Sequence, residues 1–292
     1  MLNKDTVIGF IGTGVMGKSM VQHLLRQGYR VLVYNRTKAK TGDLLEAGAV
    51  WEDTPAAVAS KATVTITMVG FPADVEEIYL NEEGIINNCQ PGSYLIDMTT
   101  SSPALAVKIY EKAKAKGVFA LDAPVSGGDV GARNATLTIM VGGDEEAFHD
   151  VEPILRILGN NVILQGGAGA GHHTKMCNQI AIASNMMGVC EAIAYAKKAG
   201  LDPSRVLQSI GTGAAGSWSL NNLAPRMMAE DFAPGFYVKH FIKDMKIALD
   251  AAKEMGIPMP GLELAKKLYD ELASSGGNDS GTQALYKLYC QE

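Results

Sequence analysis

The chain has 292 residues, of which 47% are hydrophobic, so it is too long for one typical domain and can fill the cores of two. Its net charge of −5, with no basic cluster interleaved with aromatic residues, argues against a nucleic-acid-binding protein. No apolar stretch reaches the roughly 20 residues that span a bilayer, and glycines interrupt the first stretch, so we expect a cytoplasmic protein without a membrane span or secretory signal.

An apolar run over residues 7–11 leads into Gly12-Thr13-Gly14-Val15-Met16-Gly17, and a helical pattern follows as far as Gly28. This order of strand, glycine turn and helix is typical of dinucleotide-binding domains. Gly12 permits the tight turn, Gly14 lets the backbone approach a pyrophosphate, and Gly17 lets the helix pack closely on the strand. The helix N-terminus also favours the negative charge of the pyrophosphate. The alternative is a glycine turn in another kind of α/β protein.

A second apolar run, residues 29–34, ends in Asn35-Arg36-Thr37. NAD-preferring sites usually place Asp or Glu about 20 residues beyond the glycines, where the carboxylate binds the ribose hydroxyls. That carboxylate is missing here, and the guanidinium of Arg36 can bind a 2′-phosphate through charge-assisted hydrogen bonds. We therefore expect a preference for NADP(H), with NAD(H) as the second choice. Alternatively, Arg36 is a solvated charge at the start of a helix.

Farther along, apolar strand patterns alternate with helical ones, which predicts a parallel sheet covered by helices and therefore an α/β Rossmann-type dinucleotide-binding domain. The predicted strands are 63–69, 94–98, 119–123, 137–141 and 161–165. Ligands of such sheets bind beyond the carboxyl ends of the strands. The loops expected to line the cleft are therefore 70–72, 99–103 and 124–128.

From His172 onward the pattern is helical, with turns at 200–203, 211–216, 234–235, 256–260 and 274–277. We expect residues 1–165 to form the NADP-binding Rossmann domain, and residues 166–292 to form an all-α C-terminal domain for substrate binding and oligomerisation. The second domain has more apolar side chains than its size readily covers, which predicts a homo-oligomer, either a dimer or a tetramer. These side chains are Met227, Met228, Phe232, Phe236, Tyr237 and Phe241.

The helix that begins near Gly171 is apolar on nearly every face, which is typical of a helix buried in its domain. Its first turns carry Lys175, Asn178 and Gln179, whose spacing places them on one helical face. An ammonium group is seldom buried unless it is paired or functional, and desolvation can lower its pKa into a range useful for proton transfer. Alternatively, the ammonium of Lys175 reaches the surface at the helix start.

No metal site is expected. The four cysteines are scattered without the spacing of metal ligands and are interpreted as reduced thiols. His172 and His173 are interpreted as residues of the helix start, because nothing nearby completes a ligand set.

Five motifs, in order over essentially the whole chain, resemble those of the β-hydroxyacid dehydrogenases. They are Phe10-Ile11-Gly12-Thr13-Gly14-Val15-Met16-Gly17, Asp97-Met98-Thr99-Thr100 with Pro103, Asp122-Ala123-Pro124-Val125-Ser126-Gly127-Gly128, Gly169-Ala170-Gly171 with Lys175 and Asn178, and Lys243-Asp244. The resemblance implies an oxidoreductase with a nicotinamide dinucleotide cofactor. It also implies that Lys175 is catalytic and that Asn178 orients the substrate.

The same resemblance assigns binding residues. Ser126, Gly127 and Gly128 match substrate contacts, although their residue types alone also fit a mobile turn. Gln179 stands where many family members have a second asparagine, and we expect its amide to bind substrate. Cofactor contacts are implied for Thr100 and Lys243, and Met68 and Val69 match a strand end beside the adenosine half.

Together these observations predict an NADP(H)-dependent oxidoreductase that interconverts a small semialdehyde, or a 2- or 3-oxo acid, and its hydroxy acid. Examples are 2-hydroxy-3-oxopropionate (tartronate semialdehyde) reductases and 3-hydroxyisobutyrate dehydrogenases. We expect a small anionic substrate, because the loop at 126–128 offers hydrogen-bond donors that a carboxylate can approach closely. One alternative is an imine reductase, an enzyme that shares the two-domain plan but usually lacks a lysine at position 175. The other is a nucleotide-binding scaffold without turnover.

Overall fold

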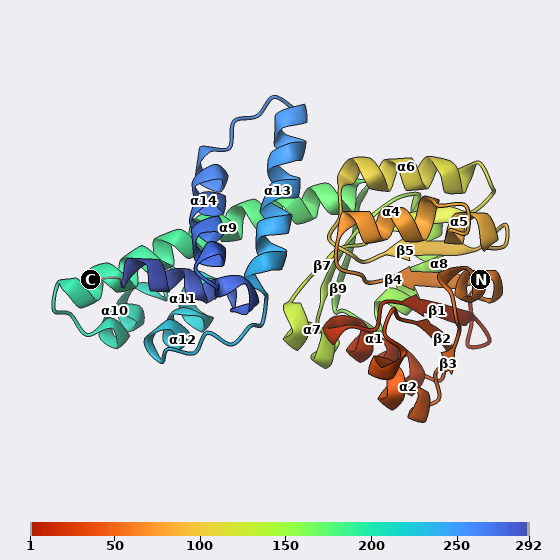
Figure 1. Ribbon diagram of the computed structural model, residues 1–292, viewed down its shortest axis with the longest axis horizontal. Helices are drawn as coiled ribbons and strands as arrows, with labels where there is room; N and C mark the ends of the chain where they lie inside the picture. Colours follow the sequence, from red (N-terminus) through yellow and green to blue (C-terminus); the bar gives the residue numbers. More distant parts are fainter. Residues whose placement is uncertain (1, 291–292) are drawn as a thin grey trace. The chain divides into compact units, whose positions relative to one another are not determined.

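The computed structural model describes residues 2–290, and their contacts divide the chain into two compact units, Met1–Lys175 and Met176–Glu292. The predicted boundary at residue 166 lies ten residues before this division. That boundary was drawn where the strands end, whereas the first turns of the next helix pack with the sheet (Figure 1).

The first unit is built on one sheet whose strand order is β3-β2-β1-β4-β5-β6-β8-β7, with β9 beside β8. The strands are β1 (Val7–Ile11), β2 (Arg30–Tyr34), β3 (Val50–Trp51), β4 (Val64–Thr67), β5 (Tyr94–Asp97), β6 (Phe119–Asp122), β7 (Val125–Ser126), β8 (Thr138–Gly142) and β9 (Asn161–Gly166). All neighbours from β3 to β6 are parallel. This run of six strands has the order of the dinucleotide-binding fold, which confirms the predicted Rossmann-type domain.

Each strand expected from an apolar run is present, and the predicted parallel sheet is confirmed from β3 to β6 and between β8 and β9. Strand β8 runs antiparallel to both β6 and β7. Between β6 and β8 the chain makes β7, which pairs antiparallel with β8, and the short helix α7 (Gly128–Asn134). Strands β3 and β7 were not predicted, because each has two residues and such a segment shows no periodicity.

Helices cover both faces of this sheet, so its strands are apolar on both sides (Figure 1). One face packs against α1 (Val15–Arg26), α2 (Gly42–Glu46), α7 and α8 (Glu145–Leu155). The other face packs against α3 (Pro55–Lys61), α4 (Pro72–Leu80), α5 (Ile85–Asn88) and α6 (Pro103–Lys114). The carboxyl ends of β1, β4, β5 and β6 therefore share one edge, from which the loops of the predicted site emerge.

The second unit is helical, as predicted. It contains most of α9 (Ala170–Lys198), followed by α10 (Pro203–Ile210), α11 (Trp218–Asn222), α12 (Ala224–Met228), α13 (Val238–Glu254) and α14 (Pro260–Ser274). Two 3-10 segments, Gly277–Asp279 and Thr282–Tyr289, complete it. Within residues 2–290, the one β pairing after β9 is an isolated bridge between Tyr237 and Gly281.

Two expectations about burial in the second unit are wrong. Helix α9 is not covered on nearly every face, because Cys177, Ala181, Ser184, Gly188, Glu191 and Tyr195 form an exposed stripe on it. Conversely, five of the six residues that suggested an oligomer pack in or against the core of their own unit: Met227, Met228, Phe232, Phe236 and Phe241. Met227 and Phe241 are 0% and 1% exposed. The sequence shows how many apolar residues this domain has, but it does not show which of their side chains pack together in one core.

Candidate active site

The glycine turn between β1 and α1 has the tight backbone that the sequence predicts. Gly12 has a φ of +97°, and a Cβ added to it would lie 2.2 Å from the carbonyl oxygen of Met68. A Cβ added to Gly17 would lie 2.1 Å from the carbonyl oxygen of Gly12. Only glycine fits these two positions without displacing backbone, so α1 begins close to β1.

The first turn of α1 offers space and hydrogen-bonding groups to a ligand. A Cβ on Gly14 would meet no atom within 4 Å, and no side chain caps the start of this helix. The hydroxyl oxygen of Thr13 is buried and has no hydrogen-bond partner among the described residues. The N–H groups of a helix start, open space and an unpartnered hydroxyl fit a pyrophosphate, so the residues present fit a dinucleotide.

The end of β2 is tied to this turn. The backbone N–H of Thr13 donates to Oδ1 of Asn35 at 3.3 Å, and Nδ2 of Asn35 donates to the carbonyl oxygen of Thr37 at 3.0 Å. Arg36 is exposed, and its guanidinium donates to Oδ1 of Asp74 at the start of α4, 3.1 Å away. The side chain of Arg36 is therefore directed along the protein surface toward α4 and is not simply solvated.

The loops after β4 and β5 are joined to each other. The backbone N–H of Val69 donates to the hydroxyl of Thr99 at 3.0 Å, and the N–H of Met68 donates to the carbonyl oxygen of Ile11. Thr100, which follows directly, is half-buried. Met68, Val69 and Thr100 therefore lie on the same edge of the sheet as the glycine turn, where a cofactor bound at that turn could meet them.

Lys175 is held inside the first unit, beside the loop predicted to bind substrate. Its side chain is buried, with 7% of the residue exposed, and its Nζ donates to the carbonyl oxygen of Val125 at 2.9 Å. Ser126 follows Val125, and Gly127 and Gly128 have φ values of +124° and +60°. The alternative that Lys175 reaches the surface is thus wrong, and its ammonium lies next to the Ser126 loop.

A carboxylate from the end of β6 holds the first turn of α9. Oδ1 of Asp122 accepts the N–H of Gly169 at 2.7 Å, and Oδ2 accepts the N–H of His172 at 2.8 Å. An anion at a helix N-terminus satisfies backbone donors that have no partner within the helix. Burial acts to raise the pKa of Asp122, but hydrogen bonds and the charge of His172 outweigh it and lower that pKa.

Glycines allow this close docking. A Cβ on Gly171 would lie 2.3 Å from the carbonyl oxygen of Met140 and 2.9 Å from Oδ2 of Asp122. A Cβ on Gly142 of β8 would lie 2.7 Å from the N–H nitrogen of Gly171. The backbone of α9 is therefore in contact with the sheet at the turn that precedes Lys175.

A second buried carboxylate lies at the end of β5. Asp97 accepts hydrogen bonds from the Thr67 hydroxyl at 2.8 Å and from the N–H of Thr99 at 3.0 Å. Burial raises the pKa of Asp97, although the positive charge of His172 and these hydrogen bonds act against the increase. The sequence analysis placed Asp97 and Asp122 in motifs without a role of their own and interpreted His172 as a residue of the helix start. The signal that could have pointed to the two acids is that each ends an apolar strand.

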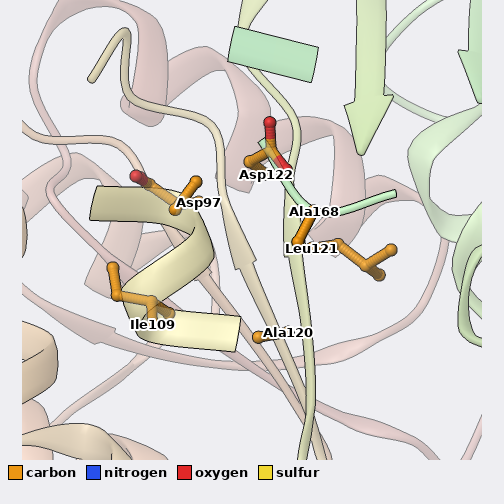
Figure 2. Close-up of a pocket in the computed structure, with 7 residues that line it drawn as sticks. Asp97, Ile109, Ala120, Leu121, Asp122 and Ala168 are labelled. Atoms are coloured by element: carbon orange, nitrogen blue, oxygen red, sulfur yellow. The ribbon is translucent and has the colours of Figure 1, made fainter. Parts of the chain in front are cut away.

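Figure 2 shows that Asp97 and Asp122 both border a small cavity, at the end away from Ile109 and Ala120. The cavity measures about 10 Å³, which is close to the volume needed for one water molecule. This cavity is too small for a substrate. The two acids that border it are neighbours at the ends of the paired strands β5 and β6.

In the second unit, three of the predicted site residues are joined through Asp244, which was not among them. Nδ2 of Asn178 donates to Gln179 at 2.7 Å, and Nε2 of Gln179 donates to Oδ2 of Asp244 at 2.6 Å. The ammonium of Lys243 lies 3.1 Å from the other oxygen of Asp244. Asp244 is 1% exposed, so this buried carboxylate fixes the orientation of the Gln179 amide and of Lys243.

Among residues 2–290, no group of three or more His, Cys, Asp or Glu side chains could hold a metal ion. No helix in the described part of the chain is both long and apolar enough to cross a membrane.

Comparison with known proteins gives matches over nearly the whole chain. A family model described as the NAD binding domain of 6-phosphogluconate dehydrogenase matches residues 7–167. A second model, described as the NAD-binding of NADP-dependent 3-hydroxyisobutyrate dehydrogenase, matches residues 169–289.

Individual relatives agree with these models. The chain is 63% identical to an uncharacterized oxidoreductase, YkwC, of Bacillus subtilis, over 97% of this chain and 98% of the relative. It is 37% identical to 2-hydroxy-3-oxopropionate reductase of Escherichia coli, over 95% of each protein. The solved structure of a Mycobacterium tuberculosis 3-hydroxyisobutyrate dehydrogenase with L-serine has a TM-score of 0.91 and 28% identity, over 98% of this chain and 100% of that one.

Proposed function

The chain belongs to the β-hydroxyacid dehydrogenase family and is an NAD(P)-dependent oxidoreductase acting on a hydroxyl group, and we propose that it interconverts a small semialdehyde and its hydroxy acid with NADP(H). The observation that carries this proposal is the position of Lys175. Its ammonium is buried and donates to the carbonyl oxygen of Val125, beside the Ser126 loop. A buried cation next to a loop rich in hydrogen-bond donors suits a reaction in which negative charge develops on oxygen.

In the reductive direction, Lys175 would stabilise the growing alkoxide and transfer a proton from Nζ to it. In the oxidative direction, neutral Nζ would accept the hydroxyl proton. The carbonyl oxygen of Val125 accepts a hydrogen bond from Nζ and so restricts the direction of the amine. The bound nicotinamide cofactor supplies or takes the hydride. Acid–base assistance of this kind contributes about 10²- to 10⁴-fold to the rate.

We assign the substrate carboxylate to Ser126 and the backbone N–H groups of Gly127 and Gly128. The positive φ values of both glycines fit a role for their backbone rather than for a side chain. Asn178 supplies an amide toward the polar end of the substrate. The amide of Gln179, expected to bind substrate, is buried and bonded to Asn178 and Asp244, so we assign it to orienting Asn178. Two relatives support a small acid: one is named for 2-hydroxy-3-oxopropionate, and the other was solved with L-serine, which carries a carboxylate and a hydroxyl.

The proposed preference for NADP(H) rests on Arg36 and Asn35 at the end of β2. Asp74 pairs with Arg36, but the Arg36 side chain is 79% exposed. An exposed ion pair contributes only about 0 to 1 kcal/mol, whereas a charge-assisted hydrogen bond contributes about 1.5 to 3 kcal/mol. A 2′-phosphate can therefore draw Arg36 away from Asp74. In this proposal Gly12 to Gly17, Thr37, Met68, Val69, Thr100 and Lys243 complete the cofactor site.

We also propose that residues 1–165 hold the cofactor, and that residues 166–292 serve substrate binding and a homo-oligomer. Support for the oligomer comes from the exposed stripe on α9, where small side chains would let a second helix approach closely, and from Tyr195, which is 75% exposed. Light scattering during gel filtration should give a mass of two or more times 31.0 kDa. A mass equal to that of one chain would contradict this part of the proposal.

The test of the reaction is an NADPH-oxidation screen over a panel of small semialdehydes, repeated with NADH. Each active acid should be paired with its methyl ester. Loss of the carboxylate leaves buried donors unpaired, so kcat/KM for the ester should be lower by on the order of 10²-fold or more. Equal rates for acid and ester would contradict anion recognition by the Ser126 loop, and no turnover on the panel would contradict the semialdehyde substrate.

A further inference from the structure

His172 is fully buried, and both of its ring nitrogens face oxygen acceptors. Nδ1 lies 3.0 Å from Oδ2 of Asp122, and Nε2 lies 2.9 Å from the carbonyl oxygen of Thr99. A carbonyl oxygen can only accept, and an ionised carboxylate can only accept. A neutral imidazole has one N–H, so the lone pair of its other nitrogen would face the lone pairs of one of these acceptor oxygens at about 3 Å, which is unfavourable. The geometry therefore favours a proton on each nitrogen.

The charges around His172 favour the same state. Burial disfavours an imidazolium, but the hydrogen bond and charge of Asp122 outweigh it, the charge of Asp97 adds to them, and the pKa of His172 is raised. Asp122 comes from the end of β6 and Asp97 from the end of β5. Lys175, one turn along α9, is the nearest cation on the helix of His172.

The contacts of His172 connect three segments of the first unit. Asp122 holds the first turn of α9 through the backbone N–H groups of Gly169 and His172. Thr99 precedes Thr100, and its hydroxyl accepts the N–H of Val69. The imidazole therefore joins the helix that carries Lys175 to the two loops that carry Val69 and Thr100.

We propose that His172 is a positioning residue, an imidazolium that fixes the first turn of α9 against the loop at Thr99 and so holds Lys175 and the proposed cofactor contacts in one arrangement. This inference rests on the proposed role of Lys175. When the imidazolium loses a proton, one of its two hydrogen bonds is lost, and the first turn of α9 is held less firmly between Asp122 and the loop at Thr99. A misplacement of about 1 Å at a reacting group can lower the rate by about 10²-fold.

The first test is the protonation state of His172 in the wild-type protein. Proteins labelled with ¹⁵N-histidine should show, at pH 7, one histidine with both ring nitrogens protonated, and that signal should be absent from His172→Gln. The signal should remain in His173→Gln, a matched control at the exposed neighbouring position. A neutral His172 at pH 7 would overturn the inference, and this result does not depend on the substrate.

The second test is kinetic. His172→Gln keeps one donor but no charge, so its kcat should fall about 10- to 10²-fold while its KM for substrate changes only a few-fold. In the wild type, kcat should fall with rising pH together with the imidazolium signal, and His172→Gln should lack this fall. His173→Gln should match the wild type in both respects. If His172→Gln keeps the wild-type kcat and pH profile, the inference is wrong.

The two proposals fail in different ways. If Lys175→Met loses turnover and His172→Gln keeps the wild-type kinetics, the proposed role of His172 is wrong and the proposed role of Lys175 stands. If the wild type reduces no semialdehyde, the proposed reaction is wrong, and fluorescence titration with NADPH then decides the inference. A several-fold weaker affinity in His172→Gln than in His173→Gln would support it, and equal affinities would overturn it.

Discussion

At the scale of single residues, the properties of Lys175 depend on its surroundings more than on its identity. The helix buries its stem, and the carbonyl oxygen of Val125 accepts from its ammonium 2.9 Å away. Arg36 has the opposite environment, because its guanidinium is exposed and its ion pair with Asp74 competes weakly with water. The first residue is thus suited to proton transfer, and the second to recognising a charged ligand from solvent.

Lys175→Met should lower turnover by at least about 10²-fold, because methionine fills similar volume but cannot donate or accept the proton. NADPH affinity, measured by fluorescence titration, should stay within a few-fold of the wild type. The control is Lys198→Met at an exposed position of the same helix, which should leave both quantities unchanged. More than about a tenth of wild-type turnover in Lys175→Met would mean that another group transfers the proton.

Arg36→Ala should weaken NADP(H) relative to NAD(H) by roughly 10- to 100-fold, since it removes a charge-assisted contact to the 2′-phosphate. Asp74→Asn should act in the opposite direction, because it removes the carboxylate that competes with the phosphate. Dissociation constants for both cofactors, measured side by side by titration, check both variants. Equal losses for NADP(H) and NAD(H) in Arg36→Ala would rule out the assigned contact.

At the scale of elements, the docking of α9 on the sheet depends on absent side chains. A Cβ added to Gly171 would lie 2.3 Å from the carbonyl oxygen of Met140, and one added to Gly142 of β8 would lie 2.7 Å from the nitrogen of Gly171. Alanine is otherwise the better helix former. Glycine at position 171 therefore lowers the local helix propensity, but it lets Asp122 reach the N–H groups of the first turn.

Gly171→Ala should destabilise the protein by about 1 to 3 kcal/mol, the usual range for overpacking, and should also lower kcat because the turn before Lys175 is displaced. Gly42→Ala is the matched control: its φ of −49° is helical, and no atom lies within 4 Å of the added Cβ. That substitution should stabilise by about 0.4 to 1 kcal/mol. Urea unfolding measures the free energy of unfolding of both variants. Equal changes in that free energy would show that the backbone near Gly171 moves to accept the methyl group without loss of stability.

Local patterns predicted the elements well and their long-range contacts poorly. Strands such as β1 and β5 were found because burial on both faces gives continuous apolar runs, and Lys175 was found because it interrupts an apolar helix. Strand β7, with two residues, gives no such signal. His172 was interpreted as a residue of the helix start, because its partners Asp122 and Thr99 are 50 and 73 residues away and no local pattern connects them.

At the scale of the whole molecule, three buried groups make stability depend on pH. Despite burial, Asp122 raises the pKa of His172 above 6.5, so the stability that His172 contributes is complete below pH 6.5 and is lost as pH rises through the raised value. Despite burial, His172 lowers the pKa of Asp122 below 3.8, so that contribution is present above pH 3.8 and is lost on acidification. Burial raises the pKa of Asp97, which reduces stability as pH rises above 3.8.

The free energy of unfolding should therefore fall as pH is raised above 6.5, and it should fall less in His172→Gln. Urea titrations at a series of pH values check this, with His173→Gln as the variant that keeps the wild-type slope. The difference between the two variants isolates His172 from all other titrating groups. Parallel curves for both would mean that His172 has the same pKa in the folded and unfolded chain.

The bond between Asp122 and the first turn of α9 also sets an order for folding during synthesis. Gly169 and His172 follow Asp122 by 47 and 50 residues, so every strand of the sheet is made before the donors that this buried carboxylate requires. A nascent chain that ends at residue 165 should have a marginally stable sheet, whereas one extended through residue 180 should resist proteolysis. The nucleotide-binding half is thus completed on the ribosome only by residues that follow its last strand.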